Sequence, residues 1–383
     1  MGALFQNYAR RPIAIVEGKG TEVFDANGKR YLDFTSGIAV CALGHAHPAL
    51  VKAIQEQSEK LWHISNLFES PGQEKLAASL VKDTHLSYAF FCNSGAEANE
   101  AAIKMARKHT GKHKIITFDQ SFHGRTFGAM SATGQAKVQQ GFGPLVSEFI
   151  TLPFNDIEAL KAAVADDIAA IMLEPIQGEG GVNPVSDEFA AAIMEIVEST
   201  NILLICDEVQ TGIGRTGKRF GYETTVLKPH LVSMAKGLGG GFPIGGLLGV
   251  EEIFETFSAG SHGTTYGGNP LAVAVSQTVI DHVFDDAFLV QVNELSAYLK
   301  QKLNATFPSL KVQGKGLILG LNLGGQEVAP IISKLDEAGL LTVGAGPYVI
   351  RLLPPLNVTK QEIDEAVEIL VSVISNEVVA AKV

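Results

Sequence analysis

The sequence predicts an α/β fold: a mostly parallel central sheet with helices on both faces, plus a smaller α+β lobe. Short apolar runs alternate with helical stretches through the middle of the chain, which is typical of strands joined by crossover helices. The runs lie at residues 88–92, 114–118, 168–173, 202–206 and 244–250, and the helical stretches at about 96–109, 157–165 and 187–198. Ligands of such sheets bind beyond the carboxyl ends of the strands, so the residues after each run are the first candidates for chemistry.

The N-terminal segment is predicted to form a small hairpin followed by a helix. Strand-like pieces at 22–24 and 31–34 flank a turn at 25–28. From Pro48, apolar residues continue at helical spacing as far as Trp62, with the proline in the first helical turn.

The pattern changes again after about residue 275. A long helix pattern at 289–303 leads to strand-like segments at 317–323 and 347–353, and Thr359 with Glu362 forms a capping box that opens a last helix. We therefore expect three parts: a segment over 1–45 that joins the small lobe, a large ligand-binding domain over 46–275, and a small C-terminal domain over 276–383.

The composition predicts a soluble cytoplasmic protein. Of its 383 residues 46% are hydrophobic, enough for a sizeable core. With 30 Lys and Arg against 41 Asp and Glu, the net charge is −11 and no basic cluster follows a phosphate backbone, so nucleic acid is not expected as a partner. No apolar run reaches membrane-spanning length, and the N-terminus lacks the pattern of a targeting segment. The scattered Cys41, Cys92 and Cys206 are expected to be reduced packing residues.

Asp207 and Lys236 form the strongest local feature. Asp207 follows the run 202–206, where a buried carboxylate is most stable opposite a positive charge such as a protonated pyridine nitrogen. Gln210 lies three residues on, within reach of a neighbouring ring hydroxyl. Lys236 stands between an apolar segment and a run of glycines, so its amine can be desolvated and nucleophilic. Taken singly, a turn cap and a solvated lysine are the commoner interpretations, but the combination at strand ends favours a cofactor.

The residues that join the run 88–92 to the next helix predict a phosphate site. The N-terminus of a helix offers free N–H groups, and Ser94 adds a hydroxyl beside the small residues Gly95 and Ala96. Ser94 and Glu97 also match a capping box, and both interpretations can hold at once.

Phe122 and Arg125 follow the run 114–118. An aromatic ring at a strand end can lie flat on a cofactor, although core packing is the commoner role, and an arginine can grip a carboxylate with two parallel bonds. Glu179 and Arg351 are a candidate ion pair between the lobes, and nothing in the sequence alone proves that they meet.

Three further patterns suggest other classes of protein. The glycines of residues 212–217 match a dinucleotide fingerprint, but they do not open a helix. Ser233 and Lys236 match the S-x-x-K pattern of serine acyl-transferases, yet the Ser-Asp-Asn and Lys-Thr-Gly partners are missing. His45 and His47 suggest a metal, but no third ligand cluster follows, so we expect a structural role and no metal.

The chain as a whole resembles the class III aminotransferases. The resemblance rests on ordered motifs: Asp33-Phe to Gly44-His-Ala-His-Pro48, Asn93-Ser-Gly-Ala-Glu-Ala-Asn-Glu100, Phe122-His-Gly-Arg-Thr126, Glu174-Pro-Ile-Gln-Gly-Glu-Gly-Gly181, Asp207-Glu-Val-Gln-Thr-Gly212, Lys236 and Thr264-Thr-Tyr-Gly-Gly-Asn-Pro270. It implies the fold type I architecture of enzymes that use pyridoxal 5'-phosphate (PLP), with PLP bound by the large domain. It also implies a homodimer that shares its active sites.

The resemblance assigns cofactor roles residue by residue. Lys236 is implied to hold PLP as an imine and to move protons, Asp207 to partner the pyridine nitrogen and Gln210 the ring oxygen. The remaining implied contacts are a ring sandwich by Phe122 and Val209, phosphate binding by Ser94, Gly95 and Ala96, a cofactor contact by His123, and a contact from Thr265 to the phosphate in the neighbouring subunit.

The same resemblance implies the substrates. Arg351 would bind the α-carboxylate of glutamate or 2-oxoglutarate, with Glu179 neutralising it otherwise, and Arg125 would bind the carboxylate of the amine donor. The runs 36–45 and 61–67 are similar to members of the class that act on N2-acetylornithine. The implied reaction, in arginine biosynthesis, moves the δ-amino group to 2-oxoglutarate and gives N-acetylglutamate 5-semialdehyde and glutamate.

The choice of amine donor depends on one position. Members that act on free ornithine tend to have a tyrosine where Ile38 stands, which holds the free α-amino group. The loss of that polar group favours an acylated nitrogen. Succinylornithine, ornithine and 4-aminobutyrate stay open as alternative donors. His230 stands where the family often has Asp, and we expect it to be structural.

Overall fold

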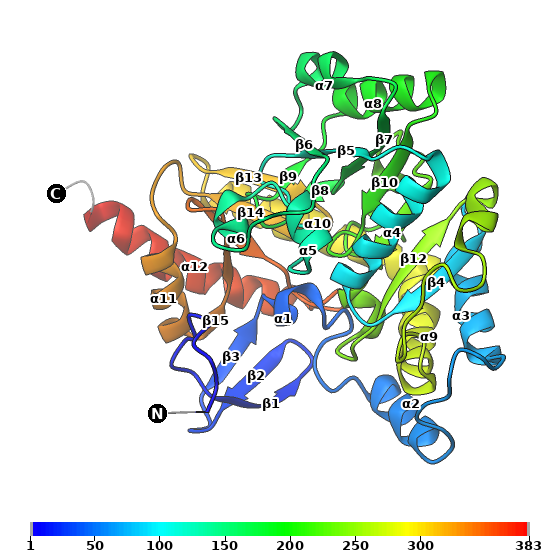
Figure 1. The fold of residues 1–383 in the computed structure, drawn as a ribbon. Coiled ribbons are helices and arrows are strands. Elements are labelled where there is room, and N and C mark those ends of the chain that lie inside the picture. Colours follow the sequence, from blue (N-terminus) through cyan, green and yellow to red (C-terminus); the bar gives the residue numbers. More distant parts are fainter. Residues whose placement is uncertain (1–2, 381–383) are drawn as a thin grey trace.

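The computed structural model describes residues 3–380 and is built around a seven-stranded sheet (Figure 1). Every neighbouring pair is parallel except those formed by β12, which is antiparallel to both β4 and β11. The order across the sheet is β4 (Tyr88–Cys92), β12 (Gly245–Gly249), β11 (Leu231–Met234), β10 (Leu203–Asp207), β7 (Ile168–Leu173), β5 (Lys114–Phe118) and β6 (Phe149–Leu152). The predicted mostly parallel sheet is confirmed.

Helices cover this sheet, and their ends are set by polar caps. Ser94, Asp156 and Ser186 each accept a backbone N–H of the first turn that follows. The strands β7 and β10 are buried along their whole length, as expected for central strands covered on both faces. The helices are α3 (Pro71–Val81), α4 (Gly95–Thr110), α7 (Ile157–Ala163), α8 (Asp187–Ser199) and α9 (Pro270–Val283).

The helix α2 (Pro48–Ser58) ends earlier than its sequence pattern predicts. Leu61 and Trp62 continue the apolar spacing but lie outside the helix, with 43% and 66% of their surface exposed. The prediction that the helical pattern reaches Trp62 is therefore wrong, because these side chains face outward instead of covering a core.

The N-terminal hairpin pairs with a strand of the C-terminal part of the chain. Strand β3 (Arg30–Asp33) pairs with β2 (Glu22–Asp25) on one side and in parallel with β15 (Leu340–Leu341) on the other. Figure 1 shows these blue strands beside α11 (Ala329–Ala338) and α12 (Lys360–Ala380). The outer strand is β1 (Ile15–Lys19).

The rest of the C-terminal part is an antiparallel sheet with long helices. The expected boundary between residues 275 and 276 falls inside α9. Thr359 and Glu362 form the predicted reciprocal capping box. The sheet order is β13 (Lys311–Lys315), β14 (Ile318–Asn322), β17 (Val349–Leu352) and β16 (Val343–Ala345), and α10 (Asp286–Thr306) packs on α12.

Short elements connect these layers. They are α1 (Ser36–Ala39), α5 (Phe127–Ala132), α6 (Ala136–Gln139), β8 (Ile176–Gln177), β9 (Asn183–Pro184) and the 3₁₀ turns η1 (Gly221–Thr224), η2 (Lys236–Gly239) and η3 (Glu251–Phe257). Within residues 3–380, no helix is both long and apolar enough to cross a membrane.

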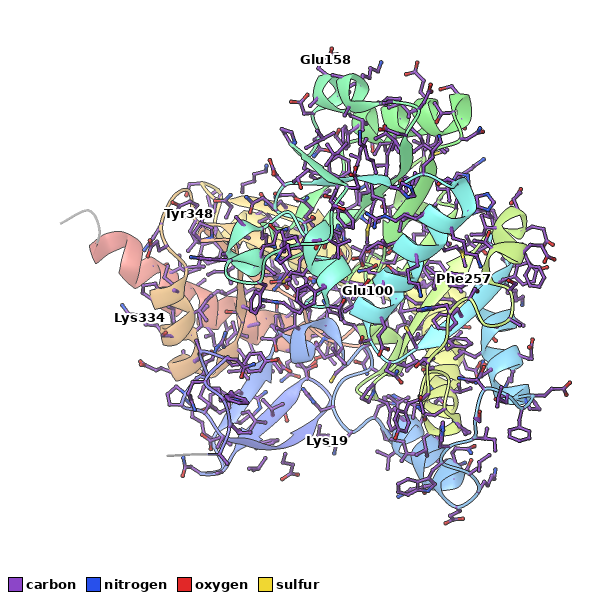
Figure 2. All side chains as sticks on the ribbon, in the orientation of Figure 1. Lys19, Glu100, Glu158, Phe257, Lys334 and Tyr348 are labelled. Atoms are coloured by element: carbon purple, nitrogen blue, oxygen red, sulfur yellow. The ribbon has the colours of Figure 1, made fainter. Side chains whose placement is uncertain are left out.

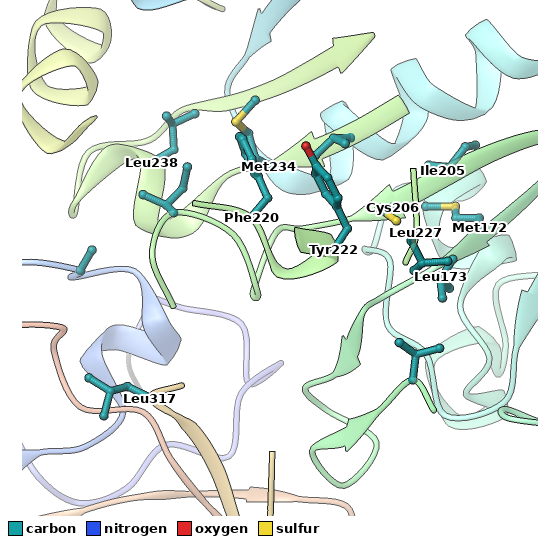
Figure 3. Close-up of a cluster of buried hydrophobic side chains, with 14 of the residues drawn as sticks. Met172, Leu173, Ile205, Cys206, Phe220, Tyr222, Leu227, Met234, Leu238 and Leu317 are labelled. Carbon is teal, nitrogen blue, oxygen red and sulfur yellow. The ribbon is translucent and has the colours of Figure 1, made fainter. Parts of the chain in front are cut away.

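The core beneath the sheet is closed by aromatic rings from the segment after β10. Figure 3 shows Phe220 and Tyr222 beside side chains of β7, β10 and β11. The two rings stack with centroids 5.8 Å apart. Cys92 and Cys206 are buried free thiols, which agrees with their predicted packing role.

The glycine run 212–217 packs against the C-terminal helices. A Cβ on Gly214 would stand 2.5 Å from Val283 Cγ1, and one on Gly217 would collide with Asn293 Oδ1. The buried Arg215 donates to the carbonyls of Leu317 and Pro354. The run therefore joins the two parts of the molecule.

His230 has the structural role that we expected. Its Nδ1 accepts the N–H of Leu204 at 3.0 Å, which extends the pairing of β10 and β11. Accepting this bond requires the neutral ring, and burial lowers the pKa of His230 below its ordinary value.

We predict that His230 makes the folded state sensitive to mild acid. Because the folded pKa of His230 is lowered, its contribution is complete above the ordinary pKa of about 6.5 and is lost as pH falls through the folded pKa. His230→Asn keeps an acceptor for Leu204 and removes the titration. Urea unfolding at pH 7.5 and 5.5 should show a smaller loss of stability in the variant than in the wild type, and equal losses would contradict this role.

Candidate functional site

A cavity of about 440 Å³ opens at the carboxyl ends of the parallel strands. It is the place predicted for ligands of this sheet class. Most of the predicted site residues line it: Ser94, Gly95, Ala96, Phe122, His123, Arg125, Asp207, Val209, Gln210 and Lys236. Glu179, Arg351 and Thr265 do not line this cavity.

Lys236 is the buried amine of the site. It begins η2, directly after β11, and has a φ of 41°, in the left-handed region. Burial lowers the pKa of Lys236, with Glu179 opposing and Arg351 adding to the effect. A lowered pKa leaves more of the amine neutral, which is the nucleophilic form.

Asp207 is held at both carboxylate oxygens. Its Oδ2 lies 2.7 Å from Nδ1 of His123 and accepts Nδ2 of Asn99 at 2.7 Å, and its Oδ1 accepts the N–H of Val209 at 3.0 Å. The carboxylate is nearly fully buried and lines the cavity. A buried carboxylate at this position favours a cationic group in the ligand.

The N-terminus of α4 fits an anion. Ser94 caps the helix by accepting the N–H of Glu97, while Glu97 accepts the Asn93 side-chain amide. A Cβ on Gly95 would stand 2.7 Å from Val209 Cγ1, so only glycine allows this approach. Ser94 thus caps the helix, and the N-terminus also faces the cavity with its free N–H groups.

Phe122 and Arg125 form one unit at the cavity wall. The guanidinium of Arg125 lies over the ring of Phe122, 5.5 Å from its centroid. Glu100, labelled in Figure 2, accepts Thr126 Oγ1 and the N–H groups of Gly128 and Ala129. This helix residue thereby fixes the loop that carries Arg125, an exposed cation in an acidic protein.

Glu179 and Arg351 meet, as the sequence suggested. The Nη1 of Arg351 donates to Glu179 Oε1 and to Gln210 Oε1, both at 2.8 Å. Burial opposes ionisation of Glu179, but the charge and hydrogen bond of Arg351 outweigh it and lower the pKa of Glu179. Among the described residues, Nε and Nη2 of the fully buried Arg351 have no partner, so they are available to an anion.

Thr265 lies apart from the cavity of its own chain. It is exposed in the segment between η3 and α9. Asn66 donates to the carbonyls on either side of it, at Thr264 and Gly267. This position agrees with the expectation that Thr265 serves another subunit and does not test it.

The sequence reasoning missed Asn99 and gave Glu174 no role. Glu174 directly follows β7, so the strand-end rule could have found it. It lines the cavity and accepts the N–H groups of Phe122 and Gly178, and burial raises its pKa to about 7. Asn99 lies one turn into α4, where a buried amide in an alanine-rich helix was the available signal.

Comparison with known proteins gives the class. The family model "Aminotransferase class-III" matches residues 5–374. The chain is 52% identical to the acetylornithine aminotransferase of Bacillus subtilis strain 168, over 98% of each protein. The corresponding protein of Bacillus anthracis is also 52% identical, over 97% of each.

Two solved structures agree with the fold. The N-acetylornithine aminotransferase of Stenotrophomonas maltophilia K279a has a TM-score of 0.85 at 38% identity, covering 97% of this chain and 98% of that one. The ornithine aminotransferase of Toxoplasma gondii, whose structure has partial occupancy of PLP, has a TM-score of 0.91 at 31% identity, covering 97% and 91%. The chain belongs to the class III aminotransferases, and its cofactor is PLP.

The cavity fits this cofactor. The helix N-terminus suits a phosphate, Asp207 suits a pyridinium, and the buried Lys236 suits a carbonyl carbon. The glycine at position 95 lets the backbone approach, and the orphaned N–H groups of Arg351 suit a carboxylate nearby.

We predict that Gly95→Ala weakens PLP binding about tenfold, because the added Cβ pushes Val209 into the cavity. Equilibrium dialysis of the apoprotein measures the dissociation constant. The double variant Gly95→Ala with Val209→Ala should bind more tightly than Gly95→Ala alone, since the clash is removed. Equal affinity of Gly95→Ala and the wild type would show that the close approach is unimportant.

Proposed function

We propose that the enzyme transfers the δ-amino group of N2-acetylornithine to 2-oxoglutarate, giving N-acetylglutamate 5-semialdehyde and glutamate in arginine biosynthesis. Curated relatives about half identical over nearly the whole chain carry the name acetylornithine aminotransferase. The observation that carries the proposal is a pair of arginines that differ in burial. Arg125 is exposed on the cavity wall, and Arg351 is buried and paired with Glu179.

The proposed roles at the cofactor follow from the contacts. When bound, PLP supplies an electron sink for negative charge on the substrate carbon. Asp207 would keep the pyridine nitrogen protonated, and Phe122 and Val209 would pack on the two ring faces. Gln210 gives its Oε1 to Arg351, and its amide also contacts Glu179, so one remaining N–H group would donate to the ring oxygen.

Lys236 would carry the cofactor and then move protons. Its lowered pKa would let the neutral amine move a proton between the substrate carbon and the cofactor. Burial of Lys236 favours this neutral form of the amine.

Arg125 and Arg351 would serve the two substrates in turn. The carboxylate of N2-acetylornithine would bind Arg125 while Glu179 holds Arg351 neutralised. The α-carboxylate of 2-oxoglutarate would then bind the free Nε and Nη2 groups of Arg351 and replace Glu179 as its countercharge. Ile38, two residues before the cavity-lining Val40, offers no polar group to a free α-amine.

We propose a homodimer for the active enzyme. An exposed apolar surface favours a protein partner, and such a surface lies around Thr265. Its large exposed side chains are Leu61, Trp62, Leu67, Phe68 and Tyr266. The segments that carry them are tied together by Asn66, which contacts Gln73 and Gly267. Thr265 would reach the phosphate of PLP in the partner.

We further propose the division at residues 45 and 275, a cytoplasmic location, and no nucleic-acid or membrane partner.

We predict that N2-acetylornithine is the best amine donor by about tenfold or more over ornithine, because a free α-amine would be desolvated beside Ile38 without a partner. The test records loss of absorbance of the lysine-linked cofactor, without acceptor, for N2-acetylornithine, N2-succinylornithine, ornithine and 4-aminobutyrate. Lys236→Ala should slow transamination by about 10³-fold or more. A preference for ornithine or 4-aminobutyrate would replace the proposed donor, and an unaffected Lys236→Ala would overturn the mechanism.

We predict that Glu179→Gln raises the rate with glutamate, relative to N2-acetylornithine, about tenfold. The substitution keeps the size of the side chain and removes the charge that occupies Arg351, so the α-carboxylate of glutamate meets less competition. Single-turnover rates with the two donors give the ratio. Arg351→Lys is the control and should lower the ratio. An unchanged ratio in Glu179→Gln would contradict the exchange at Arg351.

A further inference from the structure

Asn99 is a buried amide that the proposed mechanism does not use. Its side chain is 1% exposed, in the second turn of α4, and it lines the cavity. It lies four residues after Gly95, so one helical turn, about 5–6 Å, separates it from the phosphate cradle.

Every strong hydrogen-bonding group of the Asn99 amide has a partner. Its Nδ2 donates to Asp207 Oδ2 and to the carbonyl of His123, both at 2.7 Å, and its Oδ1 accepts from Ser233 Oγ. A flipped amide would turn its oxygen toward the carboxylate of Asp207, and both acceptors would lose the hydrogen bond that Asn99 donates. The hydroxyl of Ser233 therefore fixes which end of the amide faces Asp207.

These contacts join three parts of the cofactor site. Asn99 belongs to the helix that starts at the phosphate cradle, Asp207 ends β10, and Ser233 lies on β11, three residues before Lys236. Asp207 and Ser233 are also register partners on the two parallel strands. One amide thus connects the proposed anchors for phosphate, pyridine nitrogen and the reactive lysine.

We propose that Asn99 is a positioning residue that holds the carboxylate of Asp207 aimed at the pyridine nitrogen of PLP, with Ser233 locking the orientation of the amide. The inference rests on the proposed role of Asp207. His123 supports the same oxygen of Asp207 through Nδ1, and its buried Nε2 has no partner within the described residues. Asn99 is a neutral donor to Oδ2 of Asp207, so it supports the carboxylate without adding a positive charge that would compete with the ring nitrogen.

The test replaces Asn99 by an isosteric carboxylate. In Asn99→Asp, two buried carboxylates within hydrogen-bond distance would repel each other at pH 7.5, and the repulsion would displace Asp207 from the ring nitrogen. We expect the dissociation constant of PLP, measured by equilibrium dialysis of the apoprotein at pH 7.5, to rise at least tenfold. Lowering the pH to 5.5 should restore much of the affinity relative to the wild type, because the introduced carboxyl group, once protonated, can again donate to Asp207.

A spectroscopic signature separates positioning from general stability. A ring nitrogen that loses its proton no longer repels a proton on the lysine-linked nitrogen. The pH midpoint of the absorbance change of the bound cofactor should therefore rise by about one unit in Asn99→Asp. Ser233→Ala keeps the amide but frees its orientation, and should shift both quantities in the same direction by a smaller amount, about threefold in affinity. If Asn99→Asp does not fold, the result with Ser233→Ala decides whether Asn99 positions Asp207.

Two further variants complete the design. Asn293→Asp alters an amide that donates to two backbone carbonyls away from the cavity, and should change neither the affinity nor the midpoint. Asp207→Asn should change both strongly. The inference is wrong if Asp207→Asn changes the affinity and the midpoint while Asn99→Asp and Ser233→Ala leave both as in the wild type. It is equally wrong if those two variants lower only the unfolding temperature. If Asp207→Asn itself has no effect, the proposed role of Asp207 fails and this inference fails with it.

Discussion

The burial of charged groups at the carboxyl ends of the parallel strands is the constraint on which the rest of this structure depends. Asp207, Glu174, Lys236 and Arg351 are all largely removed from water here. Moving such groups into a protein interior costs several kcal/mol each unless partners are fixed in place. The surrounding residues supply those partners: backbone N–H groups for Glu174, and Asn99 with His123 for Asp207.

Two buried groups, Lys236 and Arg351, are not fully compensated by their neighbours and are therefore available to ligands. Lys236 has a lowered pKa because burial outweighs its acidic neighbours, and Arg351 keeps two nitrogens, Nε and Nη2, without partners among the described residues. A ligand would lower the free energy of both groups. Lys236 would bond to a carbonyl carbon, and Arg351 would pair with a carboxylate. The site therefore has an amine that suits a cofactor with a carbonyl group and a guanidinium that suits a dicarboxylate.

Much of this arrangement could be predicted from the sequence, because it follows from local rules. Asp207 and Phe122 were identified by their position after apolar runs, and Ser94 by its position before a helix. Those rules depend only on residues close together in the chain. The contact between Glu179 and Arg351 was suggested but not proved, since residues 172 positions apart meet only through the fold.

Other features could not be predicted, because their causes are contacts between distant elements. Asn99 matters through Asp207 and Ser233, which lie 108 and 134 positions away. Leu61 and Trp62 fit a helical pattern, yet the helix ends before them and they face outward. Periodicity shows that side chains share a face, and it does not show whether a protein surface or solvent lies opposite that face.

The turn at residues 36–39 also depends on contacts between distant elements. Four consecutive residues have positive φ, including Ile38 at 64°, although only Gly37 adopts this region freely. A left-handed conformation costs roughly 1–2 kcal/mol per L-residue, so the turn needs external support. Asp33 accepts the N–H groups of Thr35 and Ser36, and its second oxygen pairs with His45, raising the pKa of His45 to about 10.

His45 thus explains the histidine pair that resembled a metal site. It stabilises the carboxylate that holds the left-handed turn, and Ser36 adds a bond to the carbonyl of Leu353 in the C-terminal part. The turn leads directly to Val40 on the cavity wall, with Ile38 39% exposed nearby. The strained backbone is therefore placed where the proposed choice between an acylated and a free amine is made. Because the strain is supported by both parts of the molecule, the position of Ile38 depends on how they are joined.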